Sequence, residues 1–403
     1  MILKRNPRLE FWLLMAATFF VHQGLFALAA VEPNSPMADV TVVYQHWLDQ
    51  ASQTGASFGI DTAWIYPFVA WLPIRIASGF FSTDLTRGWV NLAMALNLLA
   101  LARLVRCGKK PEPAKWRAAW FVLAFIALLG PVAISRLDGI SASLALCAIP
   151  AFLALKDRAV VVWLTIATWI KVWPFVALGA LLAAAPRFKR VFWTAAIASG
   201  SLVLVAALNG ATQLFSFAAQ QGSRGIQIES PLAMPWVWAS SDRLSGSRLY
   251  YDHTYLTFQV AGPWVDSVAR LANLAMFVAL GITAWLAFRA RKSGAARNEL
   301  MAAATLTAVL DLIVFNKVGS PQYLTWMLLP VVLALAANLQ GYRWVVVGSL
   351  ALAALTHLIY PLFYAGLVAS DAAVVALLTA RNLGLIAMLV WANMRLSSLA
   401  NKA

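Results

Sequence analysis

Long apolar runs recur along the whole chain and constrain its fold more than any other feature. Runs long enough to cross a bilayer lie at residues 11–30, 88–106, 118–135, 140–155, 191–208, 264–288, 299–316, 321–339, 344–366 and 372–394. The run 159–185 is long enough for two short spans, because Pro174 ends or kinks a helix. The sequence therefore predicts an all-α polytopic membrane protein with about twelve transmembrane helices.

The composition agrees with lipid as the main solvent of this chain. Hydrophobic residues make up 62% of the sequence and charged residues only 12%, and a soluble domain could not bury so much apolar surface. The 18 tryptophans are typical of helices anchored at membrane interfaces. A net charge of +15 would suggest nucleic acid in a soluble protein, but here the basic residues form short clusters between apolar runs. We therefore expect membrane lipids, and no nucleic acid, as partners.

The basic clusters predict how the chain is oriented in its membrane. If both termini are cytoplasmic, 21 of the 31 lysines and arginines fall on the cytoplasmic side, with only four of the 16 acids. This count requires the apolar stretch Trp64 to Phe81 to lie along the outer surface as a helix instead of crossing. We therefore expect a multi-pass membrane protein with both termini cytoplasmic and with the loop after the first span on the outer side.

Two outer loops are long enough to hold structure of their own within a single membrane domain, residues 1–403. The first, 31–87, contains a second predicted surface helix at 39–51. Its apolar face at helical spacing consists of Val40, Val43, Tyr44, Trp47 and Ala51. The second loop, 209–263, is rich in Gln, Ser and Gly and is too long to be a plain connector.

The first outer loop is acidic and carries the leading candidate for chemistry. No lysine or arginine lies between Arg8 and Arg75, whereas five acids do: Glu10, Glu32, Asp39, Asp49 and Asp61. Asp39 would lie just outside the first span and be partly shielded from water, where it could take the proton from a sugar hydroxyl. The alternative is a solvated helix N-cap, a position that aspartate favours. Asp49 and Asp61 fit an exposed face or turn.

Two further segments concentrate groups that suit a sugar phosphate. Lys171 lies within an apolar hairpin, where lysine is costly, so that it either binds a phosphate or snorkels to the outer headgroups. Residues 316–326 join the ninth and tenth spans outside and carry Lys317, Gln322, Tyr323 and Trp326. These side chains suit a phosphate and a sugar, and the alternative is a Gly-Ser-Pro turn with an aromatic belt.

Other polar residues near the outer boundary would line a cavity or bind the acceptor. Three of them are arginines of the large outer loop that could hold an anionic headgroup. The others suit a cavity wall or a paired structural group. The full set is Tyr44, His46, Tyr66, Asp138, Arg224, Arg243, Arg248, His357 and Tyr360.

The sequence carries no pattern of a bound cofactor. It has no Gly-rich nucleotide loop and no Cys or His spacing typical of a metal site. A cytoplasmic nucleotide-sugar domain is missing too, so a sugar donor would have to arrive within the membrane. We expect no cofactor and no metal ligands among the site residues, and the sequence leaves a requirement for a divalent metal open.

Taken together, these pieces resemble the GT-C superfamily of polytopic glycosyltransferases. More narrowly, the chain resembles actinobacterial polyprenyl-phosphate-mannose-dependent α-mannosyltransferases, which extend phosphatidylinositol mannosides, lipomannan and lipoarabinomannan in the cell envelope. Each matching motif is short, and their order along nearly the whole chain is the stronger signal. They are Asp39-Val40-Thr41-Val42-Val43-Tyr44, Tyr66-Pro67-Phe68, Ile170-Lys171-Val172-Trp173-Pro174 and Ser320-Pro321-Gln322-Tyr323 running on to Trp326. One departure is Tyr66-Pro67-Phe68, where many relatives have two consecutive prolines, and another is the lack of an evident second acid near the first.

The resemblance implies an enzyme of the bacterial cytoplasmic membrane with its active site on the extracytoplasmic side. Its donor would be polyprenyl-phosphate-mannose and its acceptor a glycolipid. Asp39 would be the general base, and Lys171 with the 317–326 segment would hold the phosphate and lipid end of the donor. A hydroxyl of a lipid-anchored mannoside would displace polyprenyl phosphate in one step with inversion. Arabinose or another sugar could replace mannose.

Two other classes of protein remain open as alternatives to an enzyme. A lipid-linked sugar flippase or transporter would also have many spans, although transporters often repeat a broken helix in both halves. A break occurs near Lys171, with no convincing second copy. A non-catalytic assembly subunit is the third interpretation.

Overall fold

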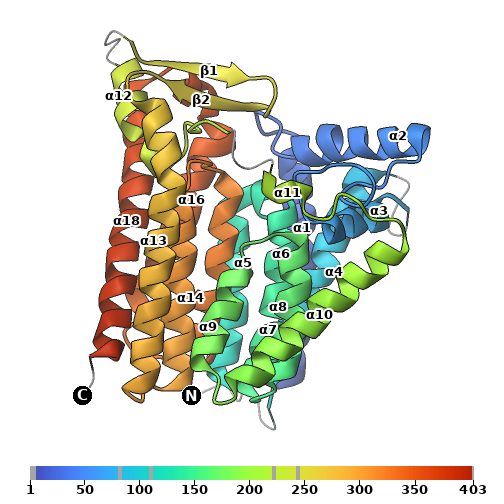
Figure 1. Ribbon diagram of the computed structural model, residues 1–403, viewed down its shortest axis with the longest axis vertical. Helices are drawn as coiled ribbons and strands as arrows, with labels where there is room; N and C mark the ends of the chain where they lie inside the picture. The colour runs from blue at the N-terminus through green and yellow to red at the C-terminus, as the bar shows by residue number, and fades with distance from the viewer. Residues whose placement is uncertain (1–5, 80–83, 109–111, 220–223, 242–245, 402–403) are drawn as a thin grey trace.

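The computed structural model describes residues 6–79, 84–108, 112–219, 224–241 and 246–401. Its helices stand side by side as one bundle (Figure 1). Within the described residues, seven helical segments are long and apolar enough to cross a membrane. They are α1 Pro7–Ala29, α4 Leu85–Val105, α5 Pro113–Leu129 with η3 Gly130–Ala133, α10 Phe188–Leu208, α13 Val265–Lys292, α16 Arg343–His357 with η6 Leu358–Leu362, and α18 Ala372–Ala400. The predicted helical architecture with membrane-spanning helices is confirmed, while the count of twelve spans and the GT-C-like fold stay predictions.

Shorter helices occupy the other predicted spans. They are α6 Leu137–Leu146, α7 Ala148–Leu153, α8 Asp157–Ile170, α9 Phe175–Ala184, α14 Arg297–Val314, and η5 Pro321–Met327 with α15 Leu328–Ala336. The predicted break in the run 159–185 is confirmed, since α8 ends at Ile170 and α9 begins after Pro174. Nearly every residue of α14 is buried, which is what a helix that is apolar on all sides requires.

Side chains in the sequence fix where several of these helices start. Asn6, Asp84 and Asp371 each accept hydrogen bonds from the first free amides of α1, α4 and α18. Pro7 occupies the first turn of α1, where a missing N–H costs nothing. These caps lie at the ends of the apolar runs, so local sequence and hydropathy agree on the bounds.

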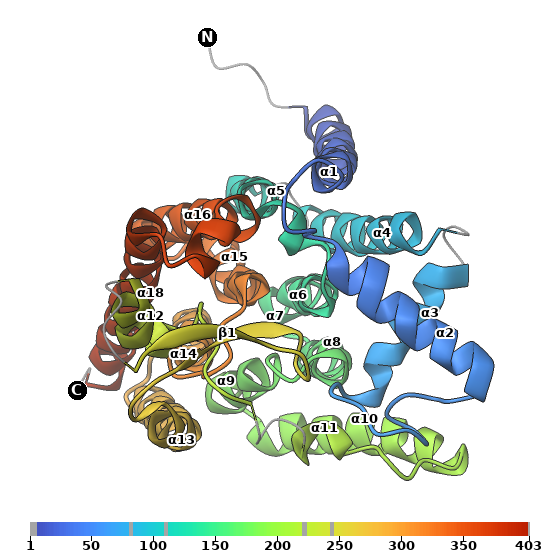
Figure 2. The same cartoon turned by 90° about the horizontal axis from the view of Figure 1, so that it is seen from above.

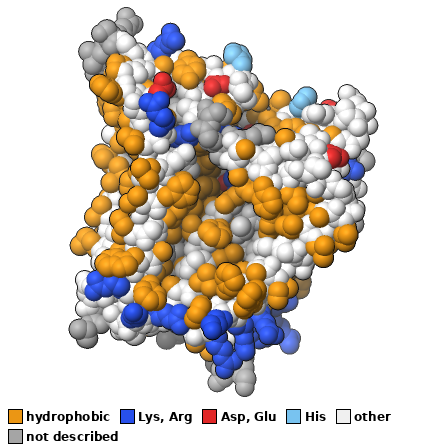
Figure 3. Space-filling model, viewed as in Figure 1, with side chains coloured by type: hydrophobic (Ala, Val, Ile, Leu, Met, Phe, Trp, Pro, Cys, Tyr) orange, Lys and Arg blue, Asp and Glu red, His pale blue; other side chains and the backbone are white. Residues whose placement is uncertain are grey.

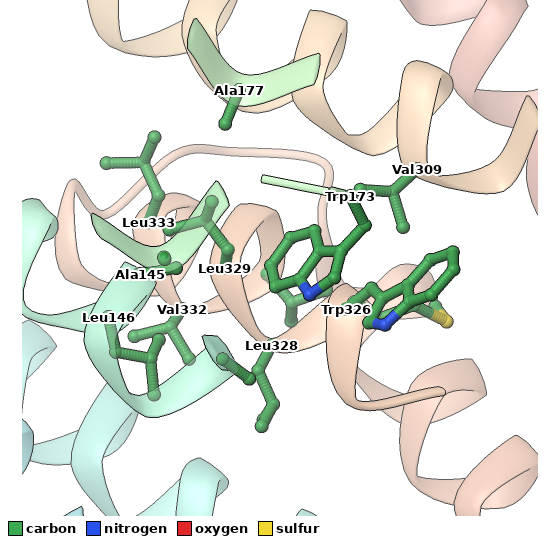
Figure 4. Packing of buried hydrophobic residues seen from close by; sticks show 14 of the residues in the cluster. Ala145, Leu146, Trp173, Ala177, Val309, Trp326, Leu328, Leu329, Val332 and Leu333 are labelled. Carbon is green, nitrogen blue, oxygen red and sulfur yellow. The ribbon is translucent and has the colours of Figure 1, made fainter. Parts of the chain in front are cut away.

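A dense core forms where α6, α9, α14 and α15 meet. Figure 4 shows Trp173 and Trp326 side by side above Leu328, with Leu329 on the other side of Trp173 and Val309 next to the two rings. The two indole rings are stacked, with centroids 5.8 Å apart and an interplanar angle of 11°. This contact holds the loop between α8 and α9 against η5, so that two motifs far apart in sequence become neighbours.

The first outer loop folds onto the upper end of the bundle in Figure 1. The predicted helix at 39–51 is present as a π-helical turn η1, Asp39–Tyr44, that continues into α2, Gln45–Thr54. Val40, Tyr44 and Leu48 are buried at helical spacing, as its amphipathic pattern predicts.

The second predicted surface helix, Trp64 to Phe81, is too long. Helical structure begins only at η2, Phe68–Ala70, and continues in α3, Trp71–Gly79, because Pro67 has extended dihedrals (φ −57°, ψ 144°). Phe81 lies outside the described residues.

The large outer loop contains structure that an all-α prediction overlooks. Its helices are α11 Ser216–Ala219, η4 Pro231–Ala233 and α12 Met234–Ser241, and α17 Tyr364–Val368 follows η6 at the same end. Strands β1, Arg248–Asp252, and β2, Thr257–Ala261, form an antiparallel hairpin in which Tyr250 pairs with Gln259. Seen from above, the hairpin crosses over the middle of the bundle, beside the first outer loop (Figure 2).

Charge is distributed unevenly along the bundle. Figure 3 shows lysine and arginine side chains gathered at the lower end, with an apolar belt above them. Helix α1 starts and α18 ends at this lower end (Figure 1). This asymmetry is the one that the basic clusters predict, and the assignment of the lower end to the cytoplasm stays a prediction.

Candidate active site

A cavity of about 760 Å³ lies at the upper end between the two outer loops. Its volume is within the range of sites that hold a small ligand. The first outer loop, the large outer loop, the segment after α14 and η6 all contribute to its wall. Its polar lining includes Asp39, His46, Tyr66, Arg136, Arg224, Gln227, Glu229, Gln322, Tyr360 and Tyr364.

Asp39 lies at this cavity and is held by a buried arginine. Its Oδ2 is 2.9 Å from Nε of Arg136, and its side chain is 29% exposed. Arg136 is itself anchored, because Nη1 donates to the carbonyl of Pro36 over 3.1 Å. The N-cap of η1 is Ala38, so the interpretation of Asp39 as a solvated N-cap is wrong. Arg136 therefore fixes the direction of the Asp39 carboxylate, which a ligand in the cavity can still reach.

Beneath the cavity floor, the predicted motifs meet in a buried polar cluster. Nζ of Lys171 is 3.1 Å from Oδ2 of Asp138 and 4.6 Å from the ring centroid of Tyr66. Nε1 of Trp326 donates to Oδ1 of Asp138 over 2.8 Å. Tyr323 stacks on Trp326 with 4.1 Å between the ring centroids. Lys171 is therefore neutralised by a carboxylate under Tyr66 and does not belong to the cavity lining.

The large outer loop brings a positive group to the cavity. The guanidinium of Arg224 lies 5.1 Å from the ring centroid of Tyr255, and its buried Nε has no hydrogen-bond partner within the described residues. Burial, together with the charge of Arg224, lowers the pKa of Lys317. Lys317 itself is 4% exposed and lies outside the cavity lining, so Arg224 is the cation that faces the cavity from this side.

Glu229 is a second carboxyl group in the cavity wall, and it is not among the site residues expected from the sequence. It is 4% exposed, and Nη2 of Arg381 donates to both its carbonyl (3.1 Å) and its Oε2 (3.3 Å). Burial raises the pKa of Glu229 to about 7, although Arg381 opposes this shift. The alternation of Ile226, Gln227, Ile228 and Glu229 was the available signal, since it puts the two polar residues on one side of an extended segment.

Arg136 was also missed as a site residue. It ends a long apolar run on the acid-rich side of the chain, where an isolated cation calls for a partner. That pattern indicated an ion pair, but not which of the five acids in the first outer loop would form it.

Three further candidates belong to the cavity wall. His46, Gln322 and Tyr360 line it, and the hydroxyl of Tyr360 donates to the carbonyl of Asn34 over 3.2 Å. Tyr360 lies within electrostatic range of both Asp39 and Glu229. It therefore shares the cavity wall with both acids.

The remaining candidates lie elsewhere. Tyr44 is buried behind the wall, where its hydroxyl accepts a hydrogen bond from the amide of Leu137 over 3.3 Å. Nε2 of His357 is 2.6 Å from Oε1 of Glu32, and neither residue lines the cavity. Arg248 is exposed on β1 outside the lining, and Arg243 lies outside the described residues.

Across the described ranges, no group of three or more His, Cys, Asp or Glu side chains is arranged to hold a metal ion. Comparison with models of known families finds no match, and comparison with curated proteins finds none either. The interpretation of this site therefore rests on its residues and their geometry.

Proposed function

We propose that the chain transfers mannose from polyprenyl-phosphate-mannose to a hydroxyl of a lipid-anchored mannoside, outside the bacterial cytoplasmic membrane. The observation that carries the proposal is Asp39, a carboxylate at a cavity of about 760 Å³ whose direction is fixed by Arg136. The resemblance to GT-C glycosyltransferases supplies the reaction class by analogy. The cavity lies at the end of the bundle away from the basic clusters, which supports an outer site.

The reaction is a single displacement at the anomeric carbon of the donor. The acceptor oxygen forms a bond to that carbon while Asp39 takes its proton. The bond between the anomeric carbon and the phosphate oxygen breaks, and its electron pair leaves with polyprenyl phosphate. A β-linked donor gives an α-linked product, and one carboxylate suffices because the phosphate leaves as an anion.

A cation of the cavity would stabilise the departing phosphate. Arg224 best suits this role because it lines the cavity, whereas Lys317 is buried outside the lining. Gln322 adds an amide to the same wall. Lys171 would act indirectly, by pairing with Asp138 and supporting Tyr66 from below.

The direct test is sugar transfer by the purified protein in lipid nanodiscs. Radiolabelled polyprenyl-phosphate-mannose and a phosphatidylinositol mannoside should give a larger, labelled glycolipid. In proteoliposomes, movement of the donor between leaflets without bond formation would instead show a flippase, and activity of neither kind would favour an assembly subunit. Labelling from polyprenyl-phosphate-arabinose but not from the mannose donor would overturn the choice of sugar while keeping the reaction class.

A further inference from the structure

The cavity wall that contains Glu229 is an extended segment, 226–230, whose main chain is held by two other parts of the chain, the loop after α14 and strand β2. The amide of Gln227 donates to the carbonyl of Lys317 over 2.9 Å, and the hydroxyl of Ser230 donates to the carbonyl of Asn316 over 2.6 Å. On its other side the amide of Ile228 donates to the carbonyl of Phe258 in β2. The segment is therefore rigidly placed between the helical bundle and the hairpin.

Glu229 is held in turn by an arginine from α18. Arg381 is 2% exposed and binds both the main chain and the carboxyl group of Glu229. An apolar pair of similar size would satisfy the same packing at lower desolvation cost. Retention of an ionisable pair at a cavity wall is therefore more readily explained by a ligand than by stability.

Asp39 and Glu229 are the two carboxyl groups among the described residues that line the cavity. Tyr360 lines the same cavity as these two carboxyl groups. A hexose carries several hydroxyl groups around one ring. One of these hydroxyls can meet Asp39 while its neighbours reach a second carboxyl group, which binds adjacent hydroxyls through its two oxygens.

We propose that Glu229 recognises the acceptor sugar, by hydrogen bonding to hydroxyl groups next to the one that Asp39 deprotonates. This inference rests on the proposed function and names the group that selects the acceptor. Arg381 acts as a positioning residue, because it holds Glu229 in the wall. Asp39 and Glu229 then have separate tasks, the first in chemistry and the second in specificity.

The test compares Glu229→Gln with a matched control, Glu32→Gln. Glu32 is likewise buried and paired with a basic side chain, His357, but lies outside the cavity lining. At pH 8, where the carboxyl group of Glu229 is mostly ionised, we expect Glu229→Gln to raise the KM for the phosphatidylinositol mannoside acceptor by about tenfold or more, because a charge-assisted hydrogen bond is lost. The kcat and the KM for the donor should change less than about threefold, and Glu32→Gln should leave all three near wild type.

A binding measurement separates this inference from the proposed function. Methyl α-mannoside should change the fluorescence of Trp47 and Trp64, which line the cavity, and Glu229→Gln should weaken this binding. Unchanged acceptor KM and unchanged methyl α-mannoside binding in Glu229→Gln would overturn the inference while transfer continues. If Glu229→Gln melts at a much lower temperature and its weaker binding is explained by the unfolded fraction alone, the inference is also overturned and the pair is purely structural. If wild type transfers no sugar, the proposed function fails, and the binding comparison still decides the role of Glu229.

Discussion

Asp39 and Arg136 show how one residue sets the geometry of another at this site. The guanidinium of Arg136 binds the carboxylate through Nε and the carbonyl of Pro36 through Nη1. Asp39 is thereby tied to the chain that precedes it as well as to the start of α6. A shorter or more mobile cation at position 136 would leave the carboxylate free to turn away from the acceptor.

We expect Arg136→Lys to lower kcat by about ten- to a hundredfold, because loss of orientation is costly in a displacement reaction. The KM for the donor should change little. Steady-state kinetics of the purified variant, with a melting curve to establish folding, checks this. A folded variant with wild-type kcat would show that Arg136 does not orient the base.

Substitutions in the buried Lys171–Asp138 pair should have non-additive effects on the free energy of unfolding. Lys171→Met or Asp138→Leu alone leaves an uncompensated buried charge and should destabilise the protein by about 3–5 kcal/mol. The double variant should be more stable than the sum of the single effects predicts, because both charges are removed. Unfolding in mixed micelles measures all three, and additive losses would mean that the 3.1 Å contact contributes no coupling.

Glu229 should make stability depend on pH. Burial raises its pKa from 4.5 to about 7, so the folded protein holds this proton more tightly than the unfolded chain does. The resulting stabilisation is complete below about pH 4.5 and is lost as the pH rises to about 7, by at most roughly 3 kcal/mol. Between pH 5 and 8 the melting temperature of Glu229→Gln should change less with pH than that of wild type. An equal pH dependence of the two melting temperatures would contradict the shift.

Among the elements, the close approach of the segment 226–230 to the loop after α14 depends on a glycine. A Cβ atom at Gly319 would lie 2.1 Å from the amide nitrogen of Ser230, and main chain cannot move aside as a flexible side chain can. This contact brings Glu229 and Arg224 to the same cavity as Gln322. The shape of the wall is thus set by main-chain packing as well as by side chains.

Gly319→Ala should displace the wall segment and cost about 1–3 kcal/mol of stability. Transfer activity should fall further than the loss of stability alone explains, because Glu229 and Arg224 both move with the wall segment. Gly281→Ala on α13 is the matched control, since nothing lies within 4 Å of its added Cβ. Equal activity in both variants would show that the cavity tolerates movement of this wall.

At the scale of the whole molecule, the orientation in the membrane follows from the uneven charge seen in Figure 3. Ser52 is exposed on α2 at the upper end, and Ser398 is exposed near the end of α18. In a background with Cys107 and Cys147 replaced by alanine, a membrane-impermeant maleimide should label Ser52→Cys in intact cells. It should label Ser398→Cys only after permeabilisation, and the reverse pattern would place the cavity in the cytoplasm.

Local sequence patterns predict the helices and one face of the site, but they do not predict which side chains far apart in the sequence pair with each other. Hydropathy identified each apolar segment, and the helical spacing of Val40 and Tyr44 identified the buried face of the first outer loop. By contrast, Glu229 and Arg381 are separated by 152 residues, and no local pattern indicates that they pair. The same reason explains why Lys171 was assigned to phosphate, since its partner Asp138 belongs to another helix.

The most direct measurement is the transfer rate of Asp39→Asn beside that of Asp49→Asn. Both residues lie on the same surface helix, but Asp49 is exposed and accepts a hydrogen bond from Gln45 over 2.8 Å, outside the cavity lining. Asp39→Asn should lower kcat by about 10²–10⁴-fold with methyl α-mannoside binding retained, because the proton acceptor is lost and the shape is kept. Asp49→Asn should transfer mannose at the wild-type rate. Transfer by Asp39→Asn at the wild-type rate would contradict the role of Asp39 as the base.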